Sequence, residues 1–379
     1  MNQNENFDYG AAIKEALKNR GRVKVLIAGK TGVGKSTLVN AVFGEDFAAT
    51  GQGEPVTQEI KTYTKEGSAL SIVDSKGLEM EDFERILTDL ETHIEEQKRS
   101  PDPNDHIHVA WLCIHEASNR VESGEERFCE MARRQGIPVI VAITQAEHIE
   151  GHPNPTAEQF QAKVEEKLHL TQHVLRVRAK ERVIIPGVAS YPAYNLERLV
   201  QVTLECVPES HRNAFAAAQT VSLKIKKDRA RGIIAGAAAG AAVIAATPIP
   251  FSDAAILIPA QIAMFASISY IYGLDITKTA LASIVTGGLG SAFATVAGQS
   301  LVANVLKIIP FVGSVVGGAI AAITASTLTA FMGESYRLAI HTLMVANPDA
   351  PPSYDDITAG FKANIKSRTA LNAAKRMID

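Results

Sequence analysis

One short glycine-rich segment near the start of the chain limits the folds that this sequence can adopt. Residues 29–37 read Gly-Lys-Thr-Gly-Val-Gly-Lys-Ser-Thr, which fits the pattern G-x-x-x-x-G-K-S. The preceding residues 23–28 are apolar and β-rich, which predicts a buried strand, and residues 36–43 have helical spacing before Gly44. A strand, a glycine loop and a helix in this order predict a phosphate-binding loop.

Each part of this loop has a chemical role in holding a phosphate chain. The glycines let backbone N–H groups close around a phosphate, and the helix N-terminus adds a favourable dipole. Lys35 is expected to reach the β- and γ-phosphates, and Ser36 is expected to ligate Mg2+. The predicted nucleotide contacts in the loop are Gly29, Thr31, Gly32, Val33, Gly34, Lys35, Ser36 and Thr37.

Two further segments carry groups that nucleotide hydrolases use to sense a γ-phosphate. Residues 74–77 read Asp-Ser-Lys-Gly at the end of a predicted strand, so Asp74 is expected to hold Mg2+ through water and the Gly77 amide to contact the γ-phosphate. A glycine-rich segment upstream reaches Thr57, a candidate Mg2+ ligand for which Thr50 is the alternative. The expected metal ligands are Ser36, Thr57 and Asp74, and the expected catalytic groups are Lys35, Thr57 and Gly77.

Strands alternate with helices through the first half of the chain. Further strands are predicted at residues 109–114, 137–143 and 182–188, with a helix at residues 122–135. This alternation predicts an α/β domain with a mostly parallel sheet, whose ligand-binding loops gather at the carboxyl ends of the strands.

Composition and charge narrow the functional classes. The chain has 379 residues, which suggests two or three domains, and its net charge of −3 gives no basic footprint, so we expect no nucleic-acid partner. The three cysteines lack paired spacing, which indicates a reducing compartment rather than a metal cluster. The N-terminus is polar and carries no secretory signal, so we expect a cytoplasmic nucleotide domain.

With these motifs in view, the first 205 residues or so resemble P-loop GTPases of the Era, TrmE and septin-like group (YfjP-type). The resemblance implies GTP/GDP and Mg2+ as ligands. The family's guanine motif, N/T-K-x-D, reads Thr144-Gln145-Ala146-Glu147 here: Thr144 fits, Gln145 loses the charge, and Glu147 keeps the carboxylate with one more methylene. The family's last motif, S-A-K, is matched to residues 188–190, so Ala189 and Ser190 are also expected at the base.

The resemblance also implies slow hydrolysis. Leu78 stands where Ras-like enzymes carry a water-orienting glutamine, and Gly32 stands where potassium-dependent relatives carry an asparagine. Hydrolysis is expected to stay slow unless a homodimer partner or an activating protein supplies the missing group. Arg120 is a candidate for that role across a dimer, and a plain surface arginine is the alternative.

The second half of the chain has a different composition. Residues 232–333 contain only four charged side chains, and three of their four apolar stretches reach the ~20 residues that span a bilayer. Basic residues at 224–231 directly precede them, which suits an anionic cytoplasmic leaflet. Modest hydrophobicity, together with Asp253 and Gln261, favours the alternative of a soluble helical bundle.

This half also shows a resemblance. Residues 248–261 and 271–274 look like the hydrophobic helical domain of unknown function in YcjF-type bacterial proteins, which often follows an Era-like GTPase domain. The resemblance implies bacterial origin and proximity to a membrane, with membrane lipid as a partner.

Together these observations predict an α/β P-loop GTPase domain followed by an all-α hydrophobic C-terminal domain. We expect a GTP-binding switch with slow Mg2+-dependent hydrolysis, coupled to a membrane-associated effector domain at the inner face of the membrane. Two alternatives stay open: a membrane-inserting or pore-like effector triggered by nucleotide, and a binding module without significant turnover. The expected segments are an N-terminal helix (1–20), the GTPase domain (21–205), a basic helical linker (206–231), the hydrophobic domain (232–345), and a linker with a C-terminal helix (346–379).

Overall fold

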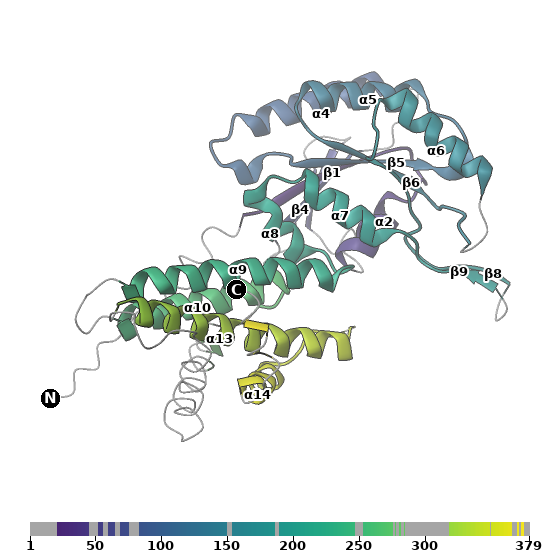
Figure 1. Cartoon of the computed structure of the whole chain (residues 1–379). Coiled ribbons are helices and arrows are strands. Elements are labelled where there is room, and N and C mark those ends of the chain that lie inside the picture. The colour runs from purple at the N-terminus through teal and green to yellow at the C-terminus, as the bar shows by residue number, and fades with distance from the viewer. Residues whose placement is uncertain are drawn as a thin grey trace. The chain divides into compact units, whose positions relative to one another are not determined.

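The chain forms two compact units in the computed structural model (Figure 1). One unit spans Gly21–Ser222, and the described residues of the other begin at Leu223. The structure describes residues 21–44, 52–55, 60–64, 69–75, 83–149, 154–185, 189–246, 253–275, 277, 280–281, 284, 318–348, 350–365, 370 and 373–374. The helix predicted over residues 1–20 lies outside these described residues.

The first unit is built on a sheet whose described strands run in the order β2-β3-β4-β1-β5-β6-β7. Along this order, neighbouring strands in the run β4-β1-β5-β6-β7 pair in parallel. β2 and β3 add an antiparallel edge next to β4. This arrangement confirms the predicted α/β class with a mostly parallel sheet. The strands are β1 (Val23–Ala28), β2 (Gln52–Pro55), β3 (Ile60–Thr64), β4 (Leu70–Ser75), β5 (Val109–His115), β6 (Val139–Thr144) and β7 (Val174–Arg176).

Helices cover both faces of this sheet (Figure 1). Every residue of β1 and β6 is buried, because helices on both faces of a parallel sheet cover its strands, and most of these residues are apolar. One face carries α4 (Phe83–Lys98), α5 (Ser123–Arg134) and α6 (Pro155–Leu168), and the other carries α2 (Lys35–Phe43), α7 (Leu196–Cys206) and α8 (Glu209–Ala218).

Trp111 anchors α2 and α7 to the middle of the sheet. Its ring is fully buried and stacks on Phe43 of α2 at a centroid distance of 5.6 Å. Its indole N–H donates a 3.1 Å hydrogen bond to the hydroxyl of Thr203 on α7. Buried indole groups need such a partner, so this single side chain fixes two helices against β5.

The last predicted strand belongs to a separate structure. Among the described strands, β7 is the final parallel strand of the sheet, so the strand predicted at residues 182–188 does not take that place; residues 186–188 lie outside the described residues. Instead β8 (Arg182–Ile185) pairs with β9 (Ala189–Tyr191) in an antiparallel hairpin. The β7 segment has three residues and ends in an arginine, so its apolar run is too short to recognise by pattern.

The second unit is a bundle of helices around one apolar core. Its long helix α13 (Gly318–Ala346) packs against α9 (Leu223–Ala246), α10 (Asp253–Ile271) and α14 (Tyr354–Ile365). In the core, Phe265 stacks on Tyr336 at 4.3 Å. A side chain at Gly333 would press on Ile234 and Met264, so this glycine is what lets α13 approach α9 and α10 closely.

Charged side chains also lie inside this bundle. Glu334 is fully buried and bonds to Arg337 at 2.7 Å and Arg231 at 3.1 Å. Lys226 is buried and donates to the carbonyl oxygen of Ile271, and burial lowers the pKa of its ammonium to about 7. Among the described helices, none combines the length and the apolar character that crossing a bilayer requires.

The boundary between the units lies inside the predicted linker 206–231. α8 packs on β1 and β4 of the first unit, whereas the basic residues from Leu223 onwards open α9 and continue into its apolar part without a break. The shift from charged to apolar residues therefore lies within α9, and the two units divide at Ser222.

Candidate functional site

The glycine loop connects the end of β1 to the start of α2. Gly29, Gly32 and Gly34 have φ angles of 138°, 78° and 97°, a backbone region that is costly for residues with a Cβ atom. A Cβ at Gly29 would also overlap the carbonyl oxygen of Cys113 on β5. The loop therefore lies tightly against the sheet and turns its backbone toward the N-terminus of α2, which is the geometry of an anion site.

Lys35 closes this loop from the first turn of α2. Its ammonium donates to the carbonyl oxygens of Gly29 at 2.8 Å and Lys30 at 3.1 Å. These contacts hold a positive charge over the loop, beside Ser36 and Thr37 on the same helix turn. The arrangement suits a chain of phosphate groups.

Asp74 supplies a carboxylate next to the loop. It follows the buried part of β4 and pairs in register with Ile27 of β1, two residues before Gly29. Its Oδ1 atom is buried and has no hydrogen-bond partner among the described residues. Burial raises the pKa of Asp74 to about 6, and the charges of Lys35 and Lys61 act against this shift.

These residues fit Mg2+. A buried carboxylate oxygen with no partner in the described part of the chain is a costly arrangement unless a ligand uses it. Oxygen ligands and bound water are what Mg2+ requires. Ser36 and Asp74 are the described residues that would hold the ion, directly or through its water. Thr57 and Gly77 lie outside the described residues, so their assigned roles stay predictions.

Thr144 joins the end of β6 to the glycine loop. Its hydroxyl lies 2.6 Å from the carbonyl oxygen of Val33 and 3.2 Å from that of Ile114. Because a hydroxyl has one hydrogen, the shorter contact to Val33 is the better one. The residue predicted to open the base-recognition motif thus also supports the phosphate loop.

The residues after Thr144 form the loop that the family resemblance assigns to the base. Gln145 has a φ of 56°, and Ala146 is buried. The carboxylate of Glu147 lies 3.1 Å from Nη1 of Arg182 on β8, and both side chains are more than half exposed. Glu147 therefore presents an accessible acceptor at the carboxyl end of the sheet.

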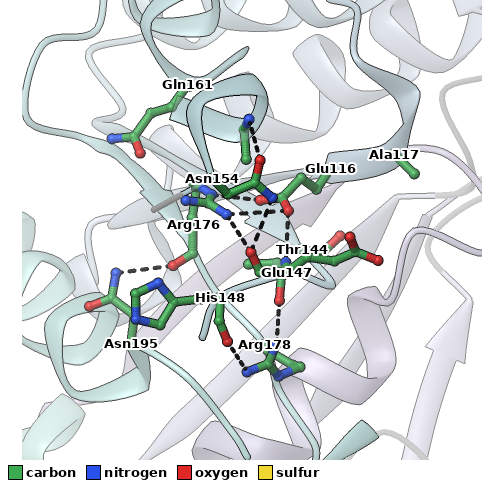
Figure 2. Close-up of polar contacts among 12 residues, drawn as sticks. Glu116, Ala117, Thr144, Glu147, His148, Asn154, Gln161, Arg176, Arg178 and Asn195 are labelled. Atoms are coloured by element: carbon green, nitrogen blue, oxygen red, sulfur yellow. Dashed lines mark hydrogen bonds and ion pairs between the residues drawn. The ribbon is translucent and has the colours of Figure 1, made fainter. Parts of the chain in front are cut away.

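A mostly buried ion pair lies beside this loop (Figure 2). Arg176 at the end of β7 contacts Glu116, which directly follows β5, with an Nε–Oε2 distance of 2.6 Å. Both residues also bond to the backbone of Glu147. Neither residue could be recognised from the sequence, because they are 60 positions apart and belong to no recognised motif.

The residues matched to the last family motif lie in a separate hairpin, and their expected role at the base stays a prediction. Ala189 and Ser190 lie on β9 in the separate hairpin, where the hydroxyl of Ser190 donates to Glu181. The segment that follows the last parallel strand is residues 177–180. The Ala146 N–H donates to the Val177 carbonyl at 3.1 Å, so this segment lies beside the base loop.

Residues 179–180 read Ala-Lys, which retains two letters of the S-A-K motif. This dipeptide was the signal that could have located the segment from the sequence. It was obscured because the strand before it has only three residues and ends in Arg176, with Arg178 following just after it.

Arg120, the candidate for a role across a dimer, forms an ion pair with Glu122 at 2.9 Å, and its side chain is 70% exposed. Lys30 of the glycine loop pairs with the same carboxylate at 2.5 Å and holds the pKa of Glu122 below its usual range. These contacts match the surface-arginine alternative.

Comparisons with known families agree with this geometry. Residues 24–145 match the family model described as 50S ribosome-binding GTPase, and residues 210–353 match a domain of unknown function, DUF697. The two matches confirm the resemblances drawn from the sequence for both halves of the chain.

Curated relatives match over parts of their length. The chain is 25% identical over 170 residues to GTPase Der of Desulforamulus reducens, which is 44% of this chain and 37% of the relative. It is 39% identical over 67 residues to the tRNA modification GTPase MnmE of Mesoplasma florum, covering 17% and 15%. It is 31% identical over 108 residues to translocase of chloroplast 101 of Physcomitrium patens, covering 27% and 10%. The chain thus spans well under half the length of these relatives.

Among solved structures, the chain is similar to a probable GTP-binding protein engB, with 21% identity and a TM-score of 0.35 over 48% of this chain and 98% of that one. Another is Era in complex with MgGDPNP and a fragment of 16S ribosomal RNA, with 20% identity and a TM-score of 0.33 over 50% and 58%.

Proposed function

We propose that this chain, which joins a GTP-binding domain of the 50S ribosome-binding GTPase family to a DUF697 domain, is a slow, Mg2+-dependent GTP hydrolase that works as a switch. The observation that carries this proposal is the convergence of Lys35, Asp74 and Thr144 on one glycine loop at the carboxyl ends of β1, β4 and β6. This is where ligands bind in open parallel sheets.

The chain's own residues divide the work in a simple way. The loop amides and Lys35 bind the phosphates. Ser36 and Asp74 would hold Mg2+, which would offset negative charge on the phosphate oxygens. Glu147 accepts hydrogen bonds from the guanine edge. Leu78 cannot orient a water molecule, so turnover is slow unless a second copy of the chain or an activating protein supplies a polar group.

A physical route for coupling leads from the nucleotide site to the start of the helical unit. The phosphates bind at the N-terminus of α2, and the other end of α2 contacts Thr220. The Thr220 N–H and hydroxyl reach the carbonyl oxygen of Val42 at 2.8 and 3.2 Å. Since α9 begins at Leu223, a displacement of α2 on nucleotide binding acts close to the point where the second unit starts.

The helical unit is then the effector, and we propose that it works at the cytoplasmic face of a membrane. The support is the basic start of α9, including Lys224, Lys227 and Arg229, directly before its apolar residues. A nucleotide-triggered pore-like protein and a module that binds without turnover remain the rival functions.

Titration of the full-length protein with fluorescent GTP, GDP and ATP analogues, with and without Mg2+, tests the central proposal. We expect GTP and GDP to bind more tightly than ATP and the affinity to require Mg2+. Lys35→Ala should abolish binding and phosphate release, whereas Lys30→Ala, in the same loop but paired with Glu122, should retain both. Absence of binding to any purine nucleotide, or tighter binding of ATP, would overturn it.

Flotation with vesicles that contain anionic lipid tests the membrane proposal. We expect the protein to float with the vesicles and the floated fraction to differ between GTP-bound and GDP-bound protein. A variant with Lys224, Lys227 and Arg229 changed to Gln should float less. Equal, negligible flotation in every nucleotide state would exclude a membrane effector and favour a soluble bundle. A content-release assay separates binding from pore formation.

A further inference from the structure

We propose that Glu116 and Arg176 are positioning residues for guanine recognition, because together they hold the backbone of Glu147 from both sides. The inference rests on the proposed function, in which the carboxylate of Glu147 binds the guanine edge. In this inference, the buried ion pair between Glu116 and Arg176 determines the direction in which the Glu147 carboxylate points.

The contacts at Glu147 form a closed arrangement (Figure 2). The N–H of Glu147 donates to Oε1 of Glu116 at 2.7 Å, and its carbonyl oxygen accepts from Nη2 of Arg176 at 2.9 Å. The two clamping side chains bond to each other through two contacts, at 2.6 and 3.3 Å. Both backbone hydrogen-bonding groups of Glu147 are therefore tied to one bidentate ion pair.

The clamp is itself rigidly supported. The side chains of Arg176 and Glu116 are 7% and 10% exposed, and the carbonyl oxygen of Arg176 accepts from the side-chain amide of Asn195 at 3.0 Å. A desolvated bidentate pair has one preferred geometry, unlike a solvated surface pair.

Arg178 extends the same support to the neighbouring peptides. Its guanidinium donates to the carbonyl oxygens of Ala146 at 2.5 Å and His148 at 3.3 Å. Two arginines thus bind three successive backbone carbonyl groups, those of residues 146 to 148. Arg176 lies at the end of β7, and Arg178 lies just after it. Alternation along an extended segment places both on the same side.

The composition of the loop explains why such a clamp is useful. Gln145 occupies the position of the lysine that packs along the base in related proteins, so that source of order is absent. Glu147 carries one more rotatable bond than aspartate, which gives its carboxylate more orientations. With its side chain more than half exposed, fixing the backbone of Glu147 is the direct means of limiting where the carboxylate points.

A comparison of GTP with ITP tests this role. Hypoxanthine lacks the 2-amino group of guanine, so the ratio of the two affinities reports how well the Glu147 carboxylate meets the base, whereas the phosphate contacts are the same for both. Hydrogen bonds to a charged acceptor predict a preference for GTP of roughly 10- to 100-fold in the natural protein.

We expect Arg176→Met and Glu116→Gln each to reduce this preference to within about 3-fold, while affinity for ITP changes by less than about 3-fold. Arg127→Met is the matched control. It removes an exposed ion pair between Arg127 on α5 and Glu84 on α4, and it should keep the full preference for GTP over ITP. Glu116→Gln retains the shape of the side chain, so it tests the idea even where Arg176→Met fails to fold.

The outcomes separate the two levels of the argument. If the natural protein binds neither GTP nor ITP, the proposed function fails. If it binds GTP without preference over ITP, the role of Glu147 and the inference both fail. If the preference is present but Arg176→Met and Glu116→Gln lower both affinities equally, the ion pair is merely structural and the inference alone is overturned.

Discussion

The hydroxyl of Thr144 lies 2.6 Å from the carbonyl oxygen of Val33, and this contact joins the two halves of the candidate nucleotide site. Val33 belongs to the glycine loop that we propose binds the phosphates, and Thr144 opens the loop that we propose binds the base. Thr144 is 4% exposed, so a buried hydrogen bond joins these two loops.

Replacing Thr144 tests this connection. Thr144→Val keeps the shape but leaves the carbonyl oxygen of Val33 without its donor, and we expect nucleotide affinity to fall by about 5- to 10-fold, equally for GTP and ITP. Thr144→Ser keeps the hydroxyl and should bind as the natural protein does. Equilibrium titration measures both. If Thr144→Val bound nucleotide as tightly as the natural protein does, the contact between Thr144 and Val33 would not be needed for the geometry of the site.

The ionised carboxylate of Asp74 lowers the free energy of unfolding, and the same carboxylate is the proposed Mg2+ ligand. Its pKa is raised from 3.8 to about 6 by burial, so its contribution to stability is fully present below pH 3.8 and is lost as pH rises through 6. At pH 7.5 the ionised carboxylate costs about 3 kcal/mol of folding free energy.

Asp74→Asn should therefore raise the melting temperature of the nucleotide-free protein at pH 7.5, with a gain that shrinks as pH falls toward 4. The same change should remove the Mg2+ dependence of nucleotide binding. Asp228→Asn, at an exposed pair with Lys224, is the control and should do neither. Melting curves across pH and Mg2+ titrations check the two parts; a lower melting temperature at pH 7.5 would contradict the first.

His108 makes the first unit sensitive to acid. Burial, with the His211 ring at 3.9 Å, lowers the pKa of His108 to about 4, and its Nδ1 accepts from the backbone N–H of Lys24 at 3.0 Å. The neutral ring is favoured in the folded state, so the stability it provides is present above pH 6.5 and is lost as pH falls toward 4.

His108→Asn, which retains an acceptor, should flatten this dependence, which amounts to about 3 kcal/mol between pH 7.5 and 4. His169→Asn serves as the control, because His169 is exposed and has a left-handed backbone that asparagine tolerates. Urea unfolding at several pH values measures the effect. An unchanged pH profile in His108→Asn would assign the acid sensitivity to other groups.

Glu334 stabilises the helical unit through buried charges. Glu334→Ala would leave the guanidinium of Arg337, whose side chain is 4% exposed, without its partner, and we expect a loss of about 3–5 kcal/mol. Glu209→Ala removes an exposed pair with Arg212 and should cost less than about 1 kcal/mol. Denaturant unfolding of the two variants compares them directly, and equal small losses would show that Glu334 is not essential to the bundle.

Local signals made much of the first unit predictable. The glycine loop, the strand before it and the helix after it are contiguous, and their residue types specify backbone geometry directly, as the positive φ angles of Gly29, Gly32 and Gly34 show. Asp74 was identified in the same way, because it directly follows an apolar strand.

Other features escaped the sequence because they depend on strand pairing. β7 is recognisable as the last strand of the sheet through its register with β6, and this pairing places residues 177–180, rather than Ala189 and Ser190, directly after the parallel sheet. The composition shift predicted a boundary within the basic linker 206–231, and the packing of α8 on β1 and β4 is what places the division at Ser222.

The sequence by itself determined the class of the fold and the place of the phosphate loop, because spacing and residue type act over a few neighbouring positions. Only the tertiary structure decided that Glu116 and Arg176 meet around the backbone of Glu147, and that Glu334 is paired inside a helical bundle. Such contacts join residues that are distant in the chain, and burial makes their geometry depend on how the whole domain packs.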